Sequence, residues 1–201
     1  MLPKALTNVI DALGSLPGVG PRTAERYAYY LFKSNSKIAE GIAEALEHLH
    51  TGVKSCPVTF ALMDADEDLS PLYTDSERDK QVVMVVEEPL DIYAMEATHA
   101  FKGTYHVLGG AISPIDGVTP EQLHIGELIK RANNDNVKEV IIATNPSVEG
   151  ESTALYLEKI LHEQNPELKL TRLARGLPLG VDLSYADQIT LSAALENRTQ
   201  L

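Results

Sequence analysis

Apolar residues recur at helical spacing in three stretches near the start of the chain. The spacing predicts helices over 4–14, 21–33 and about 36–50, with Ser36 as the N-cap of the third. The first has its apolar face at Leu6, Val9, Ile10 and Leu13. The third has its apolar stripe at Ile38, Ile42, Ala45, Leu46 and Leu49. Because three short helices bury only a small hydrophobic core by themselves, we expect them to pack against another domain or subunit.

From Gln81 the pattern changes to alternating strands and helices. Strands are expected at 81–86, 105–108, 138–144 and 168–174. Helices are expected from the residues after Glu88 to about 98, and over about 119–133, 152–162 and 185–195. This alternation predicts an α/β fold with a mainly parallel sheet, helices on both faces, and sites at the carboxyl ends of the strands. Residues 51–80 lack clear periodicity and carry the acidic run DADED at 64–68.

Charge is distributed unevenly over the 201 residues, whose net charge is -12. Residues 1–55 carry six Lys/Arg and five Asp/Glu, whereas residues 56–201 carry eleven and 24. Any DNA contact is therefore expected in the N-terminal segment. No apolar run approaches the roughly 20 residues of a membrane span, and the first residues show no signal-peptide pattern. The single cysteine, Cys56, excludes an internal disulfide framework and fits a reducing cytoplasm.

A Leu-Pro-Gly-Val-Gly turn at 16–20 leads directly into the second predicted helix. Gly18 and Gly20 allow a tight turn, and Pro21 suits the first helical position, so free amides of the helix start point outward. Arg22 and Arg26 lie one helical turn apart. The arrangement resembles the helix-hairpin-helix, which grips the DNA backbone without reading bases. The alternative is an ordinary helical hairpin.

The candidate DNA-binding residues lie along this hairpin and are expected to follow the phosphate backbone of DNA. They are Gly18, Gly20, Arg22, Arg26, Lys33 and Lys37.

Polar residues follow the first and third strands of the predicted sheet. They are Glu87, Glu88, Asn145, Ser147, Glu149 and Glu151. The pattern resembles a Toprim domain, in which the second loop of the catalytic members carries an Asp-x-Asp pair for Mg²⁺. Asn145 and Ser147 stand at those positions and are neutral, which favours a scaffold over a catalyst. The alternative is a Mg²⁺-dependent nuclease or primase-like enzyme using Glu87, Glu149 and Glu151. The acids are also candidates for docking a basic partner.

Four stretches in order resemble the RecR family of bacterial recombination mediators. They are LPGVGPRTAERYAYYLF, VVEEPLDIYAMEATHAFKGTYHVLGGAISPIDGV, EVIIATNPSVEGESTALYL and RGLPLGVDLSYADQITLSAALENR. The resemblance implies a non-enzymatic DNA repair and recombination protein. It implies a homo-oligomer, a dimer or a tetrameric ring that clamps DNA. With RecO and RecF, such a protein helps to load RecA at single-stranded gaps. A hairpin module on an inert α/β domain, without a ring, is a third possibility.

The resemblance divides the chain into four parts. Residues 1–53 form the helix-hairpin-helix region, 54–79 a degenerate zinc-finger-like linker, 80–175 the Toprim domain and 176–201 a C-terminal segment for oligomer contact.

The family's four-cysteine zinc site is incomplete in this chain. The resemblance maps it to Cys56, Thr59, Ser70 and Tyr73, so one thiolate of four is kept. Hydroxyl groups are poor zinc ligands because they stay protonated near neutral pH. We therefore expect no zinc and no other cofactor. Val58, Phe60, Leu62 and Leu72 are expected to form a small apolar core in place of the metal.

The remaining residues show no second catalytic pattern. His99, His106, His124 and His162 lack a ligand spacing and are expected to be structural. No G-x-S-x-G elbow and no ATP-binding P-loop is present.

Overall fold

The computed structural model describes residues 2–134 and 136–198 and divides the chain into two compact units, Met1–Lys54 and Ser55–Leu201. Each unit is treated by itself. In the described ranges, every helix is too short or too polar to cross a bilayer.

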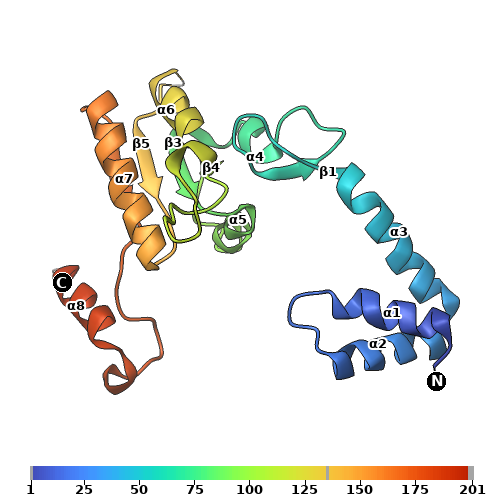
Figure 1. The fold of residues 1–201 in the computed structure, drawn as a ribbon. Helices are drawn as coiled ribbons and strands as arrows, with labels where there is room; N and C mark the ends of the chain where they lie inside the picture. Colours follow the sequence, from blue (N-terminus) through green and yellow to red (C-terminus); the bar gives the residue numbers. More distant parts are fainter. Residues whose placement is uncertain (1, 135, 199–201) are drawn as a thin grey trace. The chain divides into compact units, whose positions relative to one another are not determined.

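The first unit consists of three helices (Figure 1). They are α1 (Lys4–Gly14), α2 (Pro21–Lys33) and α3 (Ser36–Gly52). α1 packs against α2, whose Ala24 and Ala28 are buried. The small side chains allow the two helices to approach closely, and a Cβ built at Gly14 would lie 3.8 Å from the Ala24 Cβ, at ordinary van der Waals distance. The prediction that Ser36 caps α3 is wrong: the Asn35 carboxamide oxygen accepts the amide N–H of Lys37 at 3.1 Å and caps the helix one residue earlier.

The apolar stripe of α3 is exposed within the described structure. Ile38, Ile42, Leu46 and Leu49 keep between 41% and 63% of their surface accessible, and α3 has no buried residue. The first unit therefore leaves an apolar helix face without a cover of its own.

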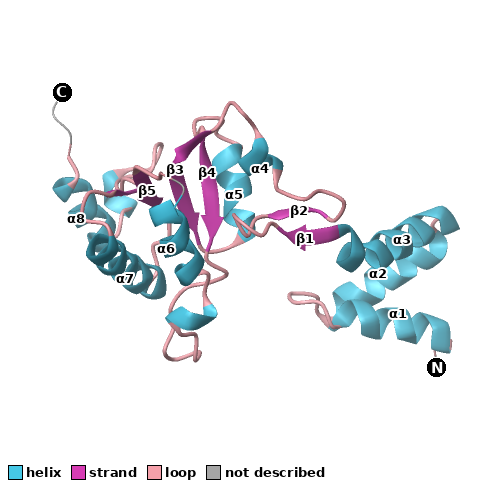
Figure 2. Cartoon of the chain, turned by 90° about the horizontal axis from the view of Figure 1, so that it is seen from above, coloured by secondary structure: helices cyan, strands magenta, loops and turns pink. Residues whose placement is uncertain are grey.

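The second unit is built on a four-stranded sheet with the order β4-β3-β5-β6, and all of its pairings are parallel. Its strands are β3 (Asp79–Val86), β4 (Gly103–Val107), β5 (Glu139–Ile142) and β6 (Lys169–Arg172). β3, β4 and β5 are visible side by side in Figure 2. A separate two-stranded sheet pairs β1 (Val53–Ser55) with β2 (Leu62–Asp64). The predicted α/β class with a mainly parallel sheet is confirmed.

Each face of the sheet has its own core. On one face, Val83 and Val85 pack with residues of α6 (Ile125–Asn134) and α7 (Val148–Gln164). On the other face, Met84 and Val86 pack with Ile92 of α5 (Pro89–Glu96) and with residues of the 60–72 segment. Figure 1 shows α7 and α5 on opposite sides of the strands. β3 therefore supplies alternate side chains to both cores, as its continuous apolar run predicts.

Three helix boundaries differ from the predictions. The helix expected over 119–133 is a short 3-10 turn, Pro120–Gln122, followed by α6, because Leu123 turns extended and its side chain is buried. α7 begins at Val148 rather than Ser152, because the Ser147 hydroxyl accepts the Gly150 amide N–H at 3.0 Å. The last helix, α8 (Gln188–Glu196), begins later than expected. A 3-10 turn at Leu183–Tyr185 precedes it, and the Asp187 carboxylate caps the start of α8.

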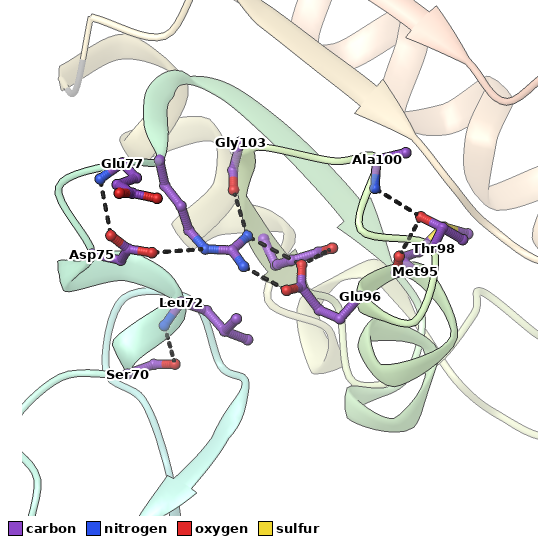
Figure 3. A network of polar contacts seen from close by, with 11 residues as sticks. Ser70, Leu72, Asp75, Glu77, Met95, Glu96, Thr98, Ala100 and Gly103 are labelled. Atoms are coloured by element: carbon purple, nitrogen blue, oxygen red, sulfur yellow. Dashed lines mark hydrogen bonds and ion pairs between the residues drawn. The ribbon is translucent and has the colours of Figure 1, made fainter.

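A half-buried ion pair joins the end of the 55–78 segment to α5 and β4 (Figure 3). α4 (Pro71–Thr74) precedes Arg78, whose guanidinium donates to Glu96 Oε1 and to the Gly103 carbonyl, both at 3.1 Å. The Tyr105 hydroxyl donates to the same Glu96 oxygen at 2.6 Å. Burial opposes ionisation of Glu96, but the hydrogen bonds from Arg78 and Tyr105 lower the pKa of its carboxyl group. The carboxylate is therefore held charged between its two donors.

His106 is buried in β4 with no accessible surface, and its Nε2 lies 2.8 Å from the His124 carbonyl oxygen. Burial lowers the pKa of His106 to about 3, against a smaller raising effect of that carbonyl. His106 is therefore buried and uncharged at neutral pH, whereas His124 is half-buried.

We expect the free energy of unfolding to fall as the pH drops below about 6.5, because unfolded His106 binds a proton there and folded His106 does not until about pH 3. The contribution of this group is at most about 1.4 kcal/mol per pH unit. Urea unfolding at pH 7.5, 6.0 and 5.0 measures it. His106→Gln keeps a donor for the His124 carbonyl and removes the titration, so its pH slope should be smaller. Equal slopes for both chains would contradict this account.

Candidate functional site

The turn between α1 and α2 has the backbone geometry that its glycines allow. The Val19 amide donates to the Leu16 carbonyl at 3.1 Å, and Gly18 has a φ of 79°, which a residue with a Cβ rarely adopts. Gly20 does not use its freedom, since its φ is -75°, and it serves as the N-cap of α2. A Cβ at either glycine would meet no atom within 4 Å. The outer side of the turn is therefore open to an approaching molecule.

Two cations stand at the start of α2. Arg22 and Arg26 are exposed, and the Arg26 guanidinium lies over the Tyr27 ring, 5.5 Å from its centroid. No side chain caps α2. Pro21 has no N–H, and the Thr23 and Ala24 amides both donate to the Gly20 carbonyl at 3.0 Å, so the Arg22 amide is the helix-start donor that faces an approaching anion. This end of the helix combines positive charge with one backbone donor.

The other two predicted cations lie away from the turn. Lys33 is in the last turn of α2, with Nζ 4.9 Å from the Tyr29 ring centroid, and Lys37 is on the first turn of α3. At about 1.5 Å per residue, Lys33 is about 16 Å along the helix axis from Arg22. None of these four cations is ion-paired within the part of the chain that the structure describes. Their charges are available along the length of α2 rather than at one point.

Glu87, at the carboxyl end of β3, is enclosed by Asn145 from the end of β5. Its side chain is buried, with 7% of the residue accessible. Glu87 Oε1 accepts the backbone N–H of Asn145 at 2.9 Å, and Oε2 accepts the Asn145 side-chain amide at 2.6 Å. One residue thus donates to both carboxylate oxygens, and the acid is fixed by hydrogen bonds.

Gly150 allows the first turn of α7 to approach this pair. A Cβ at Gly150 would lie 2.1 Å from the Asn145 carbonyl oxygen and 2.7 Å from Glu87 Oε1. Real Cβ atoms do not come so close to other atoms. The glycine is therefore required by contact rather than by its φ.

The other acids do not converge on Glu87. Glu151 is paired with Arg172 of β6 at 2.8 Å and with Arg175, and hydrogen bonds from Arg172 and then Arg175 lower the pKa of its carboxyl group to about 2. Glu88 is exposed before α5, and Glu149 lies in the first turn of α7. Across residues 2–134 and 136–198, no three His, Cys, Asp or Glu residues group as metal ligands. The structure thus brings Glu87, Asn145 and Ser147 to one helix start, and it directs Glu151 toward arginines.

Arg172 and Arg175 are the residues that the sequence patterns missed. They lie at and beyond the end of β6, the neighbour of β5 in the sheet, and their guanidinium groups reach Glu151 at the start of α7. The order of the third and fourth strands along the chain is the signal from which a contact between these arginines and Glu151 could have been predicted. Beside them is a cavity of about 780 Å³ between the start of α7 and residues 174–193, with Ser147, Glu151 and Arg175 in its lining.

The four residues to which the resemblance maps a zinc site lie in the 56–73 segment. Cys56, Thr59 and Ser70 are fully buried, and the Ser70 amide lies 3.5 Å from Cys56 Sγ. Burial opposes ionisation of the thiol, but the Thr59 hydroxyl and the amides of Ser70, Thr59 and Val58 lower the pKa of Cys56 overall. The Tyr73 ring faces two cations, 4.5 Å from Lys80 Nζ and 5.3 Å from the guanidinium carbon of Arg131.

These features define a class: a helix-hairpin-helix unit joined to a Toprim-type α/β unit. Family models match in the same order, "RecR, helix-hairpin-helix" at residues 6–50, "Toprim domain" at 81–174 and "RecR, C-terminal" at 176–199.

Two full-length relatives make the assignment specific. The "Recombination protein RecR" of Pelotomaculum thermopropionicum is 46% identical over 198 residues, covering 98% of this chain and 97% of the relative. That of Moorella thermoacetica is 48% identical over 199 residues, covering 99% and 98%. The chain belongs to the RecR family.

We expect Gly150→Ala to lower the free energy of unfolding by about 2–3 kcal/mol, because the new methyl group must displace the Asn145 backbone or the Glu87 carboxylate. The matched control is Gly126→Ala in α6, where a Cβ meets nothing within 4 Å. That control should be neutral or more stable by up to about 1 kcal/mol, since alanine favours helix. Chemical denaturation of the three chains decides, and equal stability of both variants would show that the contact around Glu87 is not tight.

Proposed function

We propose that this chain is a DNA repair and recombination mediator that binds DNA as a clamp or ring and acts without catalysis. It would work with RecO and RecF to help load RecA at single-stranded gaps, in a repair route independent of RecBC. The observation that carries the proposal is the open turn of the first unit, where the exposed side chains of Arg22 and Arg26 stand beside the start of α2, which no side chain caps. The name carried by both full-length relatives, "Recombination protein RecR", supports the same role.

The contacts expected with DNA are to its phosphates. Arginine and helix-start amides bind phosphate oxygens, which carry no sequence information. Lys33 and Lys37 extend the same positive charge along α2 and to α3. We therefore expect binding that is strongly salt-dependent and indifferent to base sequence. A protein acting on gaps in chromosomal DNA would do so in the bacterial cytoplasm.

The absence of catalysis is proposed from the hydrogen bonds and ion pairs that the acids at the strand ends form. A Mg²⁺ site needs charged oxygens directed at one point. Both carboxylate oxygens of Glu87 accept hydrogen bonds from Asn145. The negative charge of Glu151 is compensated by ion pairs with Arg172 and Arg175. That leaves Glu149 of the three acids considered for Mg²⁺, and one carboxylate is a weak magnesium site. The geometry favours a scaffold over a nuclease or primase-like enzyme.

Assembly into a dimer or tetrameric ring is proposed from exposed apolar surface. The stripe of α3 in the first unit is one such surface. In the C-terminal segment, Leu179, Tyr185 and Ile189 are each at least 83% exposed. Residues of this size usually become buried when a partner subunit covers them. The exposed Glu88 and the half-buried Glu149 are the acids proposed to meet a basic partner such as RecO.

The charge-reversal variant Arg22→Glu/Arg26→Glu should abolish binding to gapped DNA at low salt, because two phosphate contacts become repulsive. The matched control is Lys138→Glu/Lys159→Glu, which makes the same change in net charge at exposed positions of the second unit. It should retain the gel shift. Circular dichroism and thermal unfolding should be unchanged in both variants. Equal loss in the two would mean that net charge, not the hairpin, controls binding.

A gel series with gapped DNA and Mg²⁺ tests the absence of catalysis. We expect retarded, intact DNA whose retardation is lost as salt rises. Mg²⁺-dependent cleavage that Glu87→Gln removes would overturn the proposal in favour of a Toprim nuclease. Solution mass under the same conditions tests the oligomer, since a monomer of this size cannot encircle a duplex.

A further inference from the structure

The residues at the zinc positions of this chain do not fit a metal. The Thr59 hydroxyl accepts the Ala61 amide at 3.3 Å, and the Ser70 hydroxyl accepts the Leu72 amide at 3.2 Å. Both oxygens are thus occupied as acceptors within their own turns. Tyr73 has two cations over its ring, and positive charge there opposes a further cation. Only the Cys56 sulfur is a good zinc ligand, and one ligand does not bind zinc.

The same residues close the segment on itself without a metal. The Cys56 amide donates to the Ala61 carbonyl at 2.8 Å, and the Phe60 amide donates to the Cys56 carbonyl at 3.0 Å. The Ser70 amide reaches Cys56 Sγ from the second half of the segment, 14 residues away. Cys56, Ala61 and Ser70 have at most 1% of their surface accessible. These contacts bring together the two halves that a zinc ion joins in a four-cysteine site.

The segment also covers an open edge of the sheet. β4 is the outer strand next to β3, and its Val107 amide donates to the Thr59 carbonyl at 2.8 Å. Unpaired strand edges invite pairing with other chains, so this bond protects the edge. Ala61 belongs to the buried core of that face, and Phe60 and Leu72 pack against it. Of the apolar residues expected to replace the metal, Phe60 and Leu72 therefore pack on the sheet, whereas Leu62 is 40% exposed and joins no core.

An aromatic stack fixes the position of the segment. The Phe60 ring lies parallel to the His124 ring, with centroids 3.7 Å apart and planes inclined by 10°. It also meets the buried His106 ring edge-on at 5.4 Å. Phe60 holds this place with a φ of 58°, a strained backbone for a residue with a Cβ. Strain of this kind persists only where the surrounding contacts outweigh it.

A second attachment comes from the cations around α4. Arg131 of α6 is buried, and its guanidinium donates to the Tyr105 carbonyl and the Thr104 hydroxyl of β4, both at 2.6 Å, while facing the Tyr73 ring. Arg78 binds Glu96 and Gly103 at the end of the same segment (Figure 3). Both arginines belong to the second unit and tie the segment to β4.

We propose that residues 55–78 form a metal-independent replacement for the family's zinc site, closed by Cys56, Thr59 and Ser70 and attached to β4 by Phe60. In this chain the segment acts as a cover of the sheet edge, and zinc contributes neither to its fold nor to the stability of the protein. The inference rests on contacts within the second unit and does not depend on the proposed DNA-binding role.

The first test is zinc content and its effect on thermal unfolding. Untagged protein refolded with excess zinc and then dialysed should contain well under about 0.2 zinc per chain by elemental analysis, whereas a structural site binds one. A strong chelator should leave the thermal midpoint unchanged within about 1 °C, since structural zinc contributes directly to folding. About one zinc per chain, with a midpoint lowered by the chelator, would overturn the proposal.

The second test is the attachment through Phe60. Phe60→Ala should raise the unfolding equilibrium constant at least about 100-fold, because it removes the stack on His124 and the contact with the sheet core. The matched control is Tyr93→Ala on α5, where the ring is 61% exposed, with an expected change below about fivefold. If Phe60→Ala does not fold, Phe60→Leu supplies the measurement, with an expected increase of at least about tenfold. An effect of either Phe60 variant no larger than that of the control would contradict the attachment.

Discussion

The second unit depends on the burial of β3 on both faces. Val83 and Val85 face α6 and α7, and Met84 and Val86 face α5 and the 60–72 segment. A strand without a solvent face must be covered on each side, and parallel connections place helices there. The small number of strands makes this demanding, because β4 is both the neighbour of β3 and an edge of the sheet. The segment after β1 is therefore needed to complete the second face.

The burial of β3 also determines the chemistry at its end. The strand delivers Glu87 to a position with 7% of its surface accessible, where an ionised carboxyl group needs donors. Parallel pairing of β3 with β5 brings Asn145 to the same edge, and its two N–H donors satisfy the two oxygens. Gly150 leaves room for this pair beneath the start of α7. The strand pairing that builds the sheet thus also places the hydrogen-bond donors that stabilise the Glu87 carboxylate.

Sequence patterns predicted the parts of this structure that depend on neighbouring residues along the chain. The run at 81–86 is a strand whose residues from Val82 to Val86 are all apolar, and Gly18 and Pro21 give the turn and helix start of the first unit. The helix after the third strand was predicted to begin at 152, which left residues 145–151, NPSVEGE, as a loop. Pro146 instead precedes the Ser147 cap, and Gly150 is inside α7 because a larger residue would collide with Asn145. The pairing of Glu151 with Arg172 and the stack of Phe60 on His124 join residues 21 and 64 positions apart in the numbering, and no local pattern carries that information.

The site at Glu87 and the 56–73 segment both use neutral hydrogen-bonding groups around a buried residue. In a site with several anionic ligands, the ligands repel one another, and the metal supplies the compensating charge. At position 145 an aspartate would face Glu87 with a second negative charge, whereas Asn145 faces it with N–H donors. In the 56–73 segment, Thr59 and Ser70 likewise accept backbone N–H groups where thiolates would need a cation. A neutral hydrogen-bonding group in place of an anion needs no compensating cation. On the proposal made above, the second unit keeps its architecture through contacts between its own side chains and backbone.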